Sequence, residues 1–295
     1  MIYIYTLDGG FTDNILLTNC IFDDIIDQKS HGEEKMKLGL PTFIECKNLK
    51  EHFDIAKELK LDFVEVNMTF PQYNPFDLNI EEINRARDNY GIFITIHADE
   101  QLNPFDFNPK VSECYFEVMR DTIRFAKVTS ARLINMHLSR GIYATLPDGP
   151  VYLYDVYREE YLSRVRAFIV MCEEEIGDAP IKIAIENTNG FTESQREAID
   201  LFMKSDKFGL TLDTGHELCV SFADAPVFNA YPEKLIHMHL HDAVGRRDHL
   251  PLGEGQVNVN KKLGLLGESD TCVVEVKKTD GLKRSLSYLK KRDFC

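Results

Sequence analysis

The sequence predicts an α/β protein, a (β/α)8 TIM barrel with a short N-terminal extension. From Met36 to the C-terminus, short apolar segments alternate with amphipathic ones, an order that produces parallel strands joined by helical crossovers. The alternation repeats eight times within about 260 residues, which is the usual size of a closed barrel. No GxGxxG motif follows the first strand, so the main reason to prefer a dinucleotide-binding open sheet is missing.

The N-terminal residues 1–34 differ from the rest of the chain. MIYIY has the composition of a short strand and ILLTNCIFDDIID has a helical apolar spacing, but the loop-like SHGEE separates both from the repeating pattern. We predict an extension at residues 1–34 and a barrel domain at residues 35–295. The sequence leaves open an alternative in which the first residues close the bottom of the barrel.

The elements follow from the periodicity of the apolar residues, with short runs as strands and longer 3.6-residue patterns as helices. The predicted strands lie at residues 37–43, Phe63–Asn67, Ile92–His97, Arg132–Leu138, Ile181–Glu186, Gly209–Asp213, Leu235–His241 and Cys272–Val276. The predicted helices lie at Asn48–Leu59, Ile80–Tyr90, Val111–Val128, Tyr157–Ile176, Glu193–Lys204, Glu217–Asn229, Asn258–Leu266 and Leu282–Lys290.

The composition disfavours several classes of protein. A net charge of −14 argues against nucleic acid and anionic membranes as partners, because a phosphate backbone attracts Lys and Arg. No apolar run approaches the length of roughly 18 residues needed to span a membrane, and we see no secretory signal at the N-terminus. The seven scattered cysteines contain no CxxC pair, as expected in a reducing cytosol. We expect a cytoplasmic protein, with the oligomeric state open and a homo-oligomer included.

Acidic and imidazole side chains lie at or near the ends of six consecutive predicted strands. The C-terminal ends of barrel strands converge on one mouth, where active sites are built. One such residue alone is more often a capping or solvated group, but six together indicate a metal centre. The mixture of imidazole and carboxylate suits Zn, Mn, Co or Fe, and the carboxylates also permit Mg. The six are His97, His137, Glu186, Asp213, His239 and Glu275.

These residues lie in motifs that resemble those of the xylose-isomerase-like TIM barrels. That family comprises sugar and sugar-phosphate isomerases and epimerases, together with the endonuclease IV type of AP endonuclease. The resemblance extends from about Met36 to the C-terminus, with the motifs in the family's order. The motifs are Ile185-Glu186-Asn187-Thr188, Leu212-Asp213-Thr214-Gly215-His216, Met238-His239-Leu240-His241-Asp242, Asp248-His249-Leu250-Pro251-Leu252-Gly253-Glu254-Gly255 and Val274-Glu275-Val276-Lys277.

For the isomerase and epimerase branch, the resemblance implies one divalent metal (Mn, Zn, Co or Mg) held by Glu186, Asp213, His239 and Glu275. Such a metal would polarise the carbonyl of a sugar or sugar phosphate and stabilise an enediolate. Glu186 and Glu275 would be the catalytic acid/base pair, one on each face of the sugar. We therefore predict a metal-dependent isomerase or epimerase.

The alternative is a zinc phosphodiesterase of the endonuclease IV type that acts on abasic DNA. The resemblance supplies further ligands for a second metal or a third zinc, with Glu186 as a bridge: His97, His137, His216 and His249. The nuclease pattern expects an aspartate where this chain has Arg247, and Asp248 lies one residue away. We therefore expect a mononuclear or dinuclear site and favour sugar chemistry.

Further residues are predicted to line the substrate pocket rather than to bind the metal. His216 is a candidate for contacts to substrate oxygens, and His237 is predicted to be buried in the core. The remaining predicted substrate-binding residues come from the end of the seventh strand and the loop after it: His241, Arg246, Arg247 and Asp248. A third hypothesis, a barrel that keeps the polar ring but only binds ligands, would be favoured by failure to bind any divalent metal.

Overall fold

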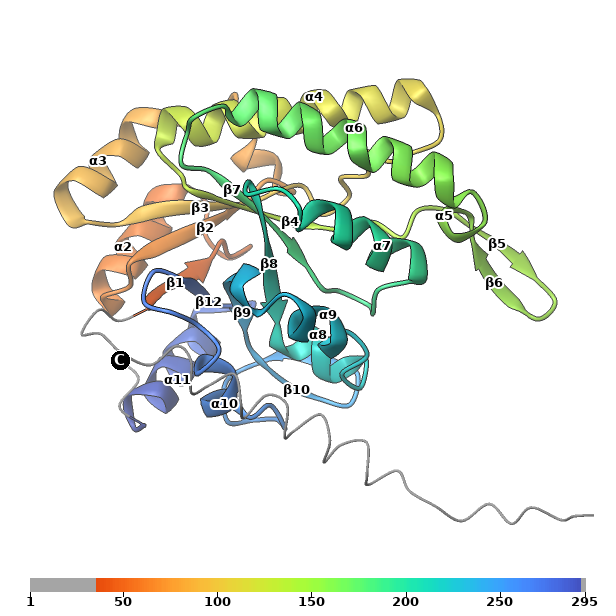
Figure 1. Ribbon diagram of the computed structural model, residues 1–295. Coiled ribbons are helices and arrows are strands. Elements are labelled where there is room, and N and C mark those ends of the chain that lie inside the picture. Colours follow the sequence, from red (N-terminus) through yellow and green to blue (C-terminus); the bar gives the residue numbers. More distant parts are fainter. Residues whose placement is uncertain (1–35, 293–295) are drawn as a thin grey trace, which may run out of the picture.

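A computed structural model describes residues 36–292 of the chain. Eight parallel strands form a closed barrel in the order β1-β12-β9-β8-β7-β4-β3-β2, with helices packed around its outside (Figure 1). The predicted (β/α)8 barrel is confirmed. The predicted extension at residues 1–34 lies outside the described residues, so the domain division remains a prediction.

The barrel strands are short, and their central residues are buried on both faces, as in other parallel sheets covered by helices. Each coincides with, or lies within one or two residues of, a predicted strand. They are β1 (Lys37–Pro41), β2 (Phe63–Asn67), β3 (Phe93–His97), β4 (Leu133–His137), β7 (Lys182–Glu186), β8 (Phe208–Asp213), β9 (Leu235–Leu240) and β12 (Thr271–Val274).

Several of the helices between the strands begin at side-chain caps. Asn48, Asn79 and Asn108 each accept a hydrogen bond from a backbone N–H in the first turn, and Thr192 forms a capping box with Gln195. None of the helices within residues 36–292 is long and apolar enough to cross a membrane. The helices are α2 (Leu49–Leu59), α3 (Ile80–Tyr90), α4 (Pro109–Thr129), α5 (Leu153–Val156), α6 (Arg158–Ile176), α7 (Glu193–Phe202), α8 (Thr214–Cys219), α9 (Ala225–Ala230), α10 (Val259–Leu263) and α11 (Thr279–Lys290).

The predicted helix at Glu217–Asn229 begins earlier and is divided in two. Because the Asp213 carboxylate accepts the backbone N–H of His216, helix α8 starts directly after strand β8. Ser221 and Phe222 have φ values of 54° and 62°, a left-handed conformation that no helix can continue through. The chain therefore breaks there before α9 begins.

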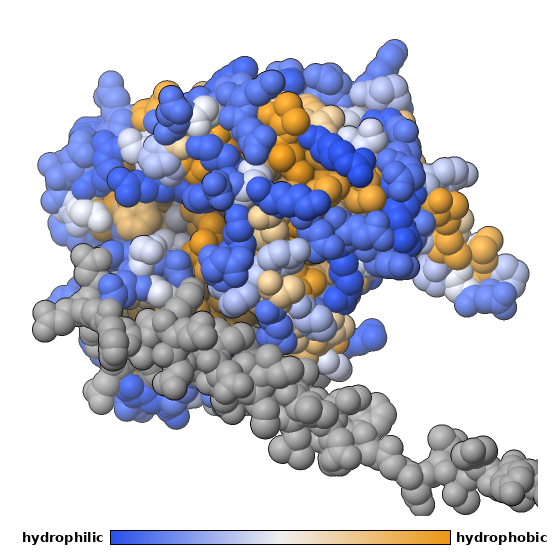
Figure 2. All heavy atoms as spheres, in the orientation of Figure 1, coloured by the Kyte–Doolittle hydropathy of each residue, from blue (hydrophilic) through white to orange (hydrophobic). Residues whose placement is uncertain are grey.

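Two antiparallel hairpins were not predicted. The first, β5 (Tyr143–Leu146) with β6 (Gly149–Tyr152), projects from the barrel (Figure 1). Hydrophobic residues stand out on it in Figure 2 against a mainly hydrophilic surface. The second, β10 (Asp242–Val244) with β11 (Arg247–Leu250), occupies the segment predicted to be a polar loop after the seventh strand.

The buried Asp242 carboxylate fixes this second hairpin to the segment after β11. Its two oxygens accept backbone N–H groups of Gly253, Gly255 and Val257, at 2.8–2.9 Å. A Cβ on Gly255 would lie 2.3 Å from an Asp242 oxygen, so this close approach requires glycine. Asp242 thus holds the loop after β11 against the start of β10.

We expect Asp242→Ala to lower the free energy of unfolding by about 3 kcal/mol, because the partly buried N–H groups of Gly253, Gly255 and Val257 would together lose their acceptor. Asp242→Asn should lose less, since its amide keeps one acceptor oxygen. Urea unfolding followed by circular dichroism measures both. Asp280→Ala, which removes an exposed carboxylate on α11, is the control and should change stability by less than about 0.5 kcal/mol. Wild-type stability in Asp242→Ala would contradict this account.

Candidate metal centre

The strand ends meet at a cavity of about 1070 Å3 in the mouth of the barrel. Four of the six strand-end residues of the predicted polar ring lie on its wall, because parallel strands end on the same side of a barrel. Those four are His97, His137, Glu186 and Glu275, and they are joined there by His216, Arg246, Asp248 and His249 from the loops and from α8.

Four residues from four different barrel strands form the innermost group. Glu186, Asp213 and His239 lie on β7, β8 and β9, and Glu275 directly follows β12. One ligand atom of each lies within 4.8 Å of the others, and all four residues are buried. This is the set predicted to hold a divalent metal.

The contacts inside this group fit a cation. His239 Nδ1 lies 3.3 Å from Glu186 Oε1 and 3.1 Å from Glu275 Oε2. His239 Nδ1 and Glu275 Oε2 are buried and have no hydrogen-bond partner. Buried polar atoms are rarely left without partners, so an imidazole nitrogen and two carboxylates that converge in this way would suit Zn, Mn, Co or Mg.

The electrostatics of the group point in the same direction. Burial alone would lower the pKa of His239, but the carboxylates around it outweigh burial and hold that pKa well above its usual value. Burial alone would raise the pKa of Glu186, and the imidazoles of His239 and His137 reverse this effect. For Glu275, Lys277 and His239 overcome burial and hold its pKa low. The carboxylates are therefore charged at neutral pH.

Glu65, which the sequence did not single out, supports His239 from the side opposite the mouth. Glu65 Oε1 lies 2.8 Å from His239 Nε2, and its other oxygen lies 3.1 Å from His237 Nε2 and 3.0 Å from the Thr95 hydroxyl. A carboxylate at Nε2 favours a proton there and leaves Nδ1 to face the mouth. The one available signal was a glutamate in the middle of the buried strand FVEVN. His237 is fully buried and hydrogen-bonded, as its predicted core position implies.

A pair of histidines lies on the other side of Glu186. His97 Nε2 and His137 Nε2 lie 3.4 and 3.3 Å from the same oxygen, Glu186 Oε2. His97 Nδ1 lies 2.8 Å from the carbonyl oxygen of Ala98, a contact that favours a proton on Nδ1 and leaves Nε2 free to bind a metal. These two histidines with Glu186 could hold a second metal.

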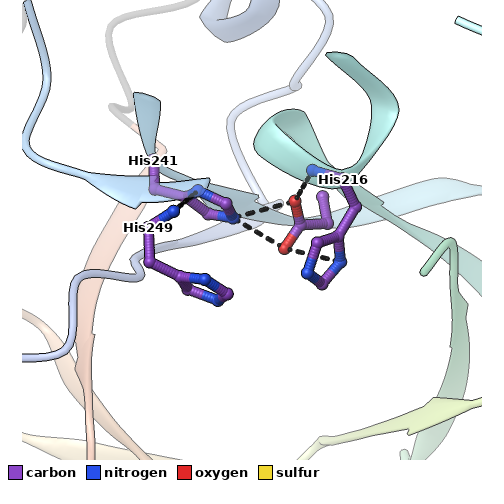
Figure 3. Close-up of side chains that lie close together, drawn as sticks. His216, His241 and His249 are labelled. Carbon is purple, nitrogen blue, oxygen red and sulfur yellow. Dashed lines mark hydrogen bonds and ion pairs between the residues drawn. The ribbon is translucent and has the colours of Figure 1, made fainter. Parts of the chain in front are cut away.

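A second group contains Asp213, His216, His241 and His249 (Figure 3). His216 Nδ1 lies 3.3 Å from Asp213 Oδ2 and 3.6 Å from Glu186 Oε1, so this group shares Asp213 with the first. His249 extends it toward Glu275, with 3.5 Å between His249 Nε2 and Glu275 Oε1.

Asp248 lies closer to this group than its position in the sequence implied. One of its oxygens lies 3.0 Å from His249 Nδ1 and the other 3.8 Å from His216 Nε2. His249 has a φ of 52°, and this turn in the backbone lets two consecutive side chains face the same cavity. Asp248 thus lines the cavity beside His216 and His249, but it is not one of the residues whose ligand atoms converge in this second group.

The other predicted substrate-binding residues divide into two kinds. Arg246 lines the cavity, whereas Arg247 is exposed and is not among the lining residues. His241 is fully buried and lies behind the cavity wall, where its ring contacts Asp213 rather than open space. Its place therefore differs from the predicted position on the pocket wall.

Two further residues of the site were not singled out from the sequence. Asn135 on β4 donates a hydrogen bond to Glu186, and Asn187 exchanges two hydrogen bonds with the Asp213 backbone. A third such residue, Lys277, lies in one of the motifs, and its Nζ donates a hydrogen bond to Glu275 Oε1 at 2.6 Å. Each steadies a carboxylate of the inner group or the backbone that carries it.

A family model described as the xylose isomerase-like TIM barrel matches residues 53–292. The chain belongs to this family. Among solved structures, a D-tagatose 3-epimerase-like protein is 26% identical with a TM-score of 0.70, and the match covers 87% of this chain and 96% of that chain. The xylose isomerase-like barrel thus has a structural neighbour named for its likeness to a sugar epimerase.

Two more distant structures share the fold. The IolI protein, solved with a bound zinc atom, is 17% identical with a TM-score of 0.66, covering 87% of this chain and 96% of that one. Endonuclease IV from Thermus thermophilus is 17% identical with a TM-score of 0.61, covering 86% of this chain and 99% of that one. The fold is therefore common to epimerase-like proteins and a nuclease.

We expect metal affinity to increase with pH. Nearby carboxylates outweigh burial and hold the pKa of His239, the imidazole of the inner group, well above its usual value. They likewise raise the pKa values of His216 and His97, candidate ligands of a further metal, to about 10 and about 9. A metal binds only neutral imidazole, so these groups must release protons as the site fills. Calorimetric titration with Mn2+ or Zn2+ in two buffers of different ionisation enthalpy measures this release. A pH-independent affinity between about pH 6 and pH 9 would contradict this expectation.

Proposed function

We propose that the protein is a divalent-metal-dependent isomerase or epimerase of a sugar or sugar phosphate. The observation that carries the proposal is the inner group, in which Glu186 and Glu275 approach the same nitrogen of His239 from separate strands. The match to a D-tagatose 3-epimerase-like protein at 26% identity supports it.

The metal would be held by Glu186, Asp213, His239 and Glu275. When bound, it would supply Lewis-acid polarisation of the substrate carbonyl, which makes the proton on the neighbouring carbon more acidic. The unpartnered buried atoms His239 Nδ1 and Glu275 Oε2 support this assignment.

Glu186 and Glu275 would move the proton. In the barrel order, β8 and β9 separate β7 from β12, so these two carboxylates reach the mouth from different sides. Both have pKa values held low and can accept a proton at neutral pH. Removal of the proton by one carboxylate, and delivery of a second proton to the opposite face of the enediolate by the other carboxylate once it has taken that proton up from solvent, would give epimerisation. Return by a single carboxylate to the neighbouring carbon would give isomerisation.

The rest of the cavity offers groups that suit a polyhydroxylated substrate. Arg140, Arg246 and Lys277 line it together with Ser139, Thr188 and Asn189. Such side chains can donate hydrogen bonds to hydroxyl or phosphate oxygens. A volume of about 1070 Å3 is large enough for a hexose or its phosphate, since small-molecule pockets commonly range from about 300 to 1,000 Å3.

Glu275→Gln should reduce turnover of a keto-sugar by at least about 100-fold, because an amide cannot accept the proton. Proton–deuterium exchange at the carbon beside the carbonyl, followed by NMR in D2O with Mn2+, measures this step over a panel of ketohexoses and their phosphates. Glu58→Gln, which alters an exposed glutamate of α2 outside the cavity, is the matched control and should keep full turnover. Full activity in Glu275→Gln would refute the acid/base assignment.

A zinc phosphodiesterase that cleaves abasic DNA is the second candidate. It is favoured by the His97–His137 pair at Glu186 and by Asp248 between His216 and His249. Three tightly held zinc ions per chain together with cleavage of an abasic duplex would establish it. Failure to bind any divalent metal would instead favour a barrel that only binds ligands.

A further inference from the structure

We infer that His241 is a positioning residue that couples Asp213, in the inner group, to the β10–β11 hairpin, which faces the substrate. This inference deepens the proposed function, since it assigns Asp213 to the metal and the hairpin to the substrate. It concerns a side chain that lies directly behind the cavity wall rather than on it.

The hydrogen bonds of His241 determine which of its nitrogens carries the proton. The backbone N–H of His249 donates to His241 Nδ1 at 2.8 Å, a much shorter contact than the 3.4 Å from Nδ1 to the carbonyl oxygen of Asp242, so Nδ1 presents its lone pair to the hairpin. The ring's remaining N–H is then at Nε2, which lies 2.9 Å from the Asp213 carboxylate. A single imidazole ring thus joins the backbone of the hairpin to a side chain of the inner group (Figure 3).

The surroundings of His241 hold this ring in one place. Thr214 Oγ1 accepts the backbone N–H of His241 and donates to its carbonyl oxygen, at 3.1 and 2.8 Å. A Cβ on Gly215 would lie 2.0 Å from His241 Cε1, so the ring packs directly against the glycine backbone. The His249 ring stacks on the other side, with centroids 4.3 Å apart and planes 4° from parallel.

The two hydrogen bonds of the His241 ring stabilise different features of the site, the backbone at His249 and the Asp213 carboxylate. His249 has a φ of 52°, which costs energy in a residue with a side chain, so the bond from its N–H to Nδ1 offsets that cost. Asp213 already accepts the backbone N–H of His216 through Oδ1 at 2.7 Å. The Nε2–H of His241 is a second donor to this carboxylate. Together the two donors fix the orientation of the Asp213 side chain within the inner group.

The structure assigns a consequence to this link. The hairpin carries Arg246, Asp248 and His249 to the cavity wall, while Asp213 belongs to the group that would hold the metal. Because His241 contacts both, order in the hairpin and the geometry of the Asp213 carboxylate depend on each other. A ligand that binds at either place should steady the other.

Two substitutions separate the two contacts. His241→Asn keeps an acceptor at the position of Nδ1 and loses the donor to Asp213, whereas His241→Gln keeps a donor near Nε2 and loses the acceptor for His249. Mn2+ titration measures metal affinity. Limited trypsin digestion, with cleavage after Arg246 and Arg247 identified by mass spectrometry, measures order in the hairpin because Arg246 and Arg247 are exposed.

His241→Asn should weaken Mn2+ binding by about 10- to 100-fold and leave the rate of hairpin cleavage within about twofold of wild type. His241→Gln should keep Mn2+ affinity within about threefold and accelerate hairpin cleavage by about tenfold. His52→Asn and His52→Gln alter another fully buried histidine that accepts a backbone N–H and should change neither measurement. Any other pattern at His241, including equal effects of its two variants, overturns the inference.

Neither measurement requires sugar turnover, so a protein that binds Mn2+ but acts on no sugar would contradict the proposed function and leave this inference to its own test. Binding of no divalent metal by the wild type would overturn both. Should both His241 variants fail to fold, Gly215→Ala displaces the same ring from outside. It should then weaken Mn2+ binding and accelerate hairpin cleavage together; retention of both wild-type values would overturn the inference.

Discussion

The site depends on the need to balance charge around one imidazole that is buried inside the barrel. His239 is fully buried, and carboxylates of Glu65, Glu186 and Glu275 lie within 3.3 Å of its two nitrogens. An isolated buried charge is far too costly to persist, so each member of this cluster requires the others. The carboxylates of Glu186, Glu65 and Glu275 favour a proton on His239 and so raise the pKa of this histidine in spite of its burial.

The two ring nitrogens of His239 have different surroundings in this cluster. Glu65, below it on β2, occupies Nε2, and the two glutamates at the mouth face Nδ1. A metal-binding histidine ordinarily needs this arrangement, because a partner at one nitrogen sets the tautomer and orients the other. The strands β2, β7, β9 and β12 therefore cooperate in one function although they are far apart in the sequence. Glu65 is buried and does not line the cavity, so it orients His239 from outside the pocket.

The sequence was sufficient for the barrel and for the strand-end ring because both follow from local patterns. Strand periodicity and the convergence of parallel strands at one mouth bring Glu186 and His239 together whatever the loops do. The role of Glu65 was not visible, because its contact with His237 joins residues 172 positions apart. The placement of Asp248 was equally hidden, since it depends on the φ of His249. Features that depend on a single backbone angle or on contacts across the barrel produce no periodic pattern in the sequence and so could not be predicted from it.

The anchoring of residues 241–257 has a consequence for protein engineering. His241 joins the start of this segment to Asp213 of the barrel and to His249. Asp242 joins the start of the segment to its end, through the N–H groups of Gly253 and Val257. The segment is thus a nearly self-contained cassette that presents three cavity-lining side chains. A graft of it onto a related barrel would have to carry Gly215 as well, because a larger residue there would occupy the space of the His241 ring. Exchanges of this cassette would therefore replace three side chains of the cavity wall with the four inner residues left in place.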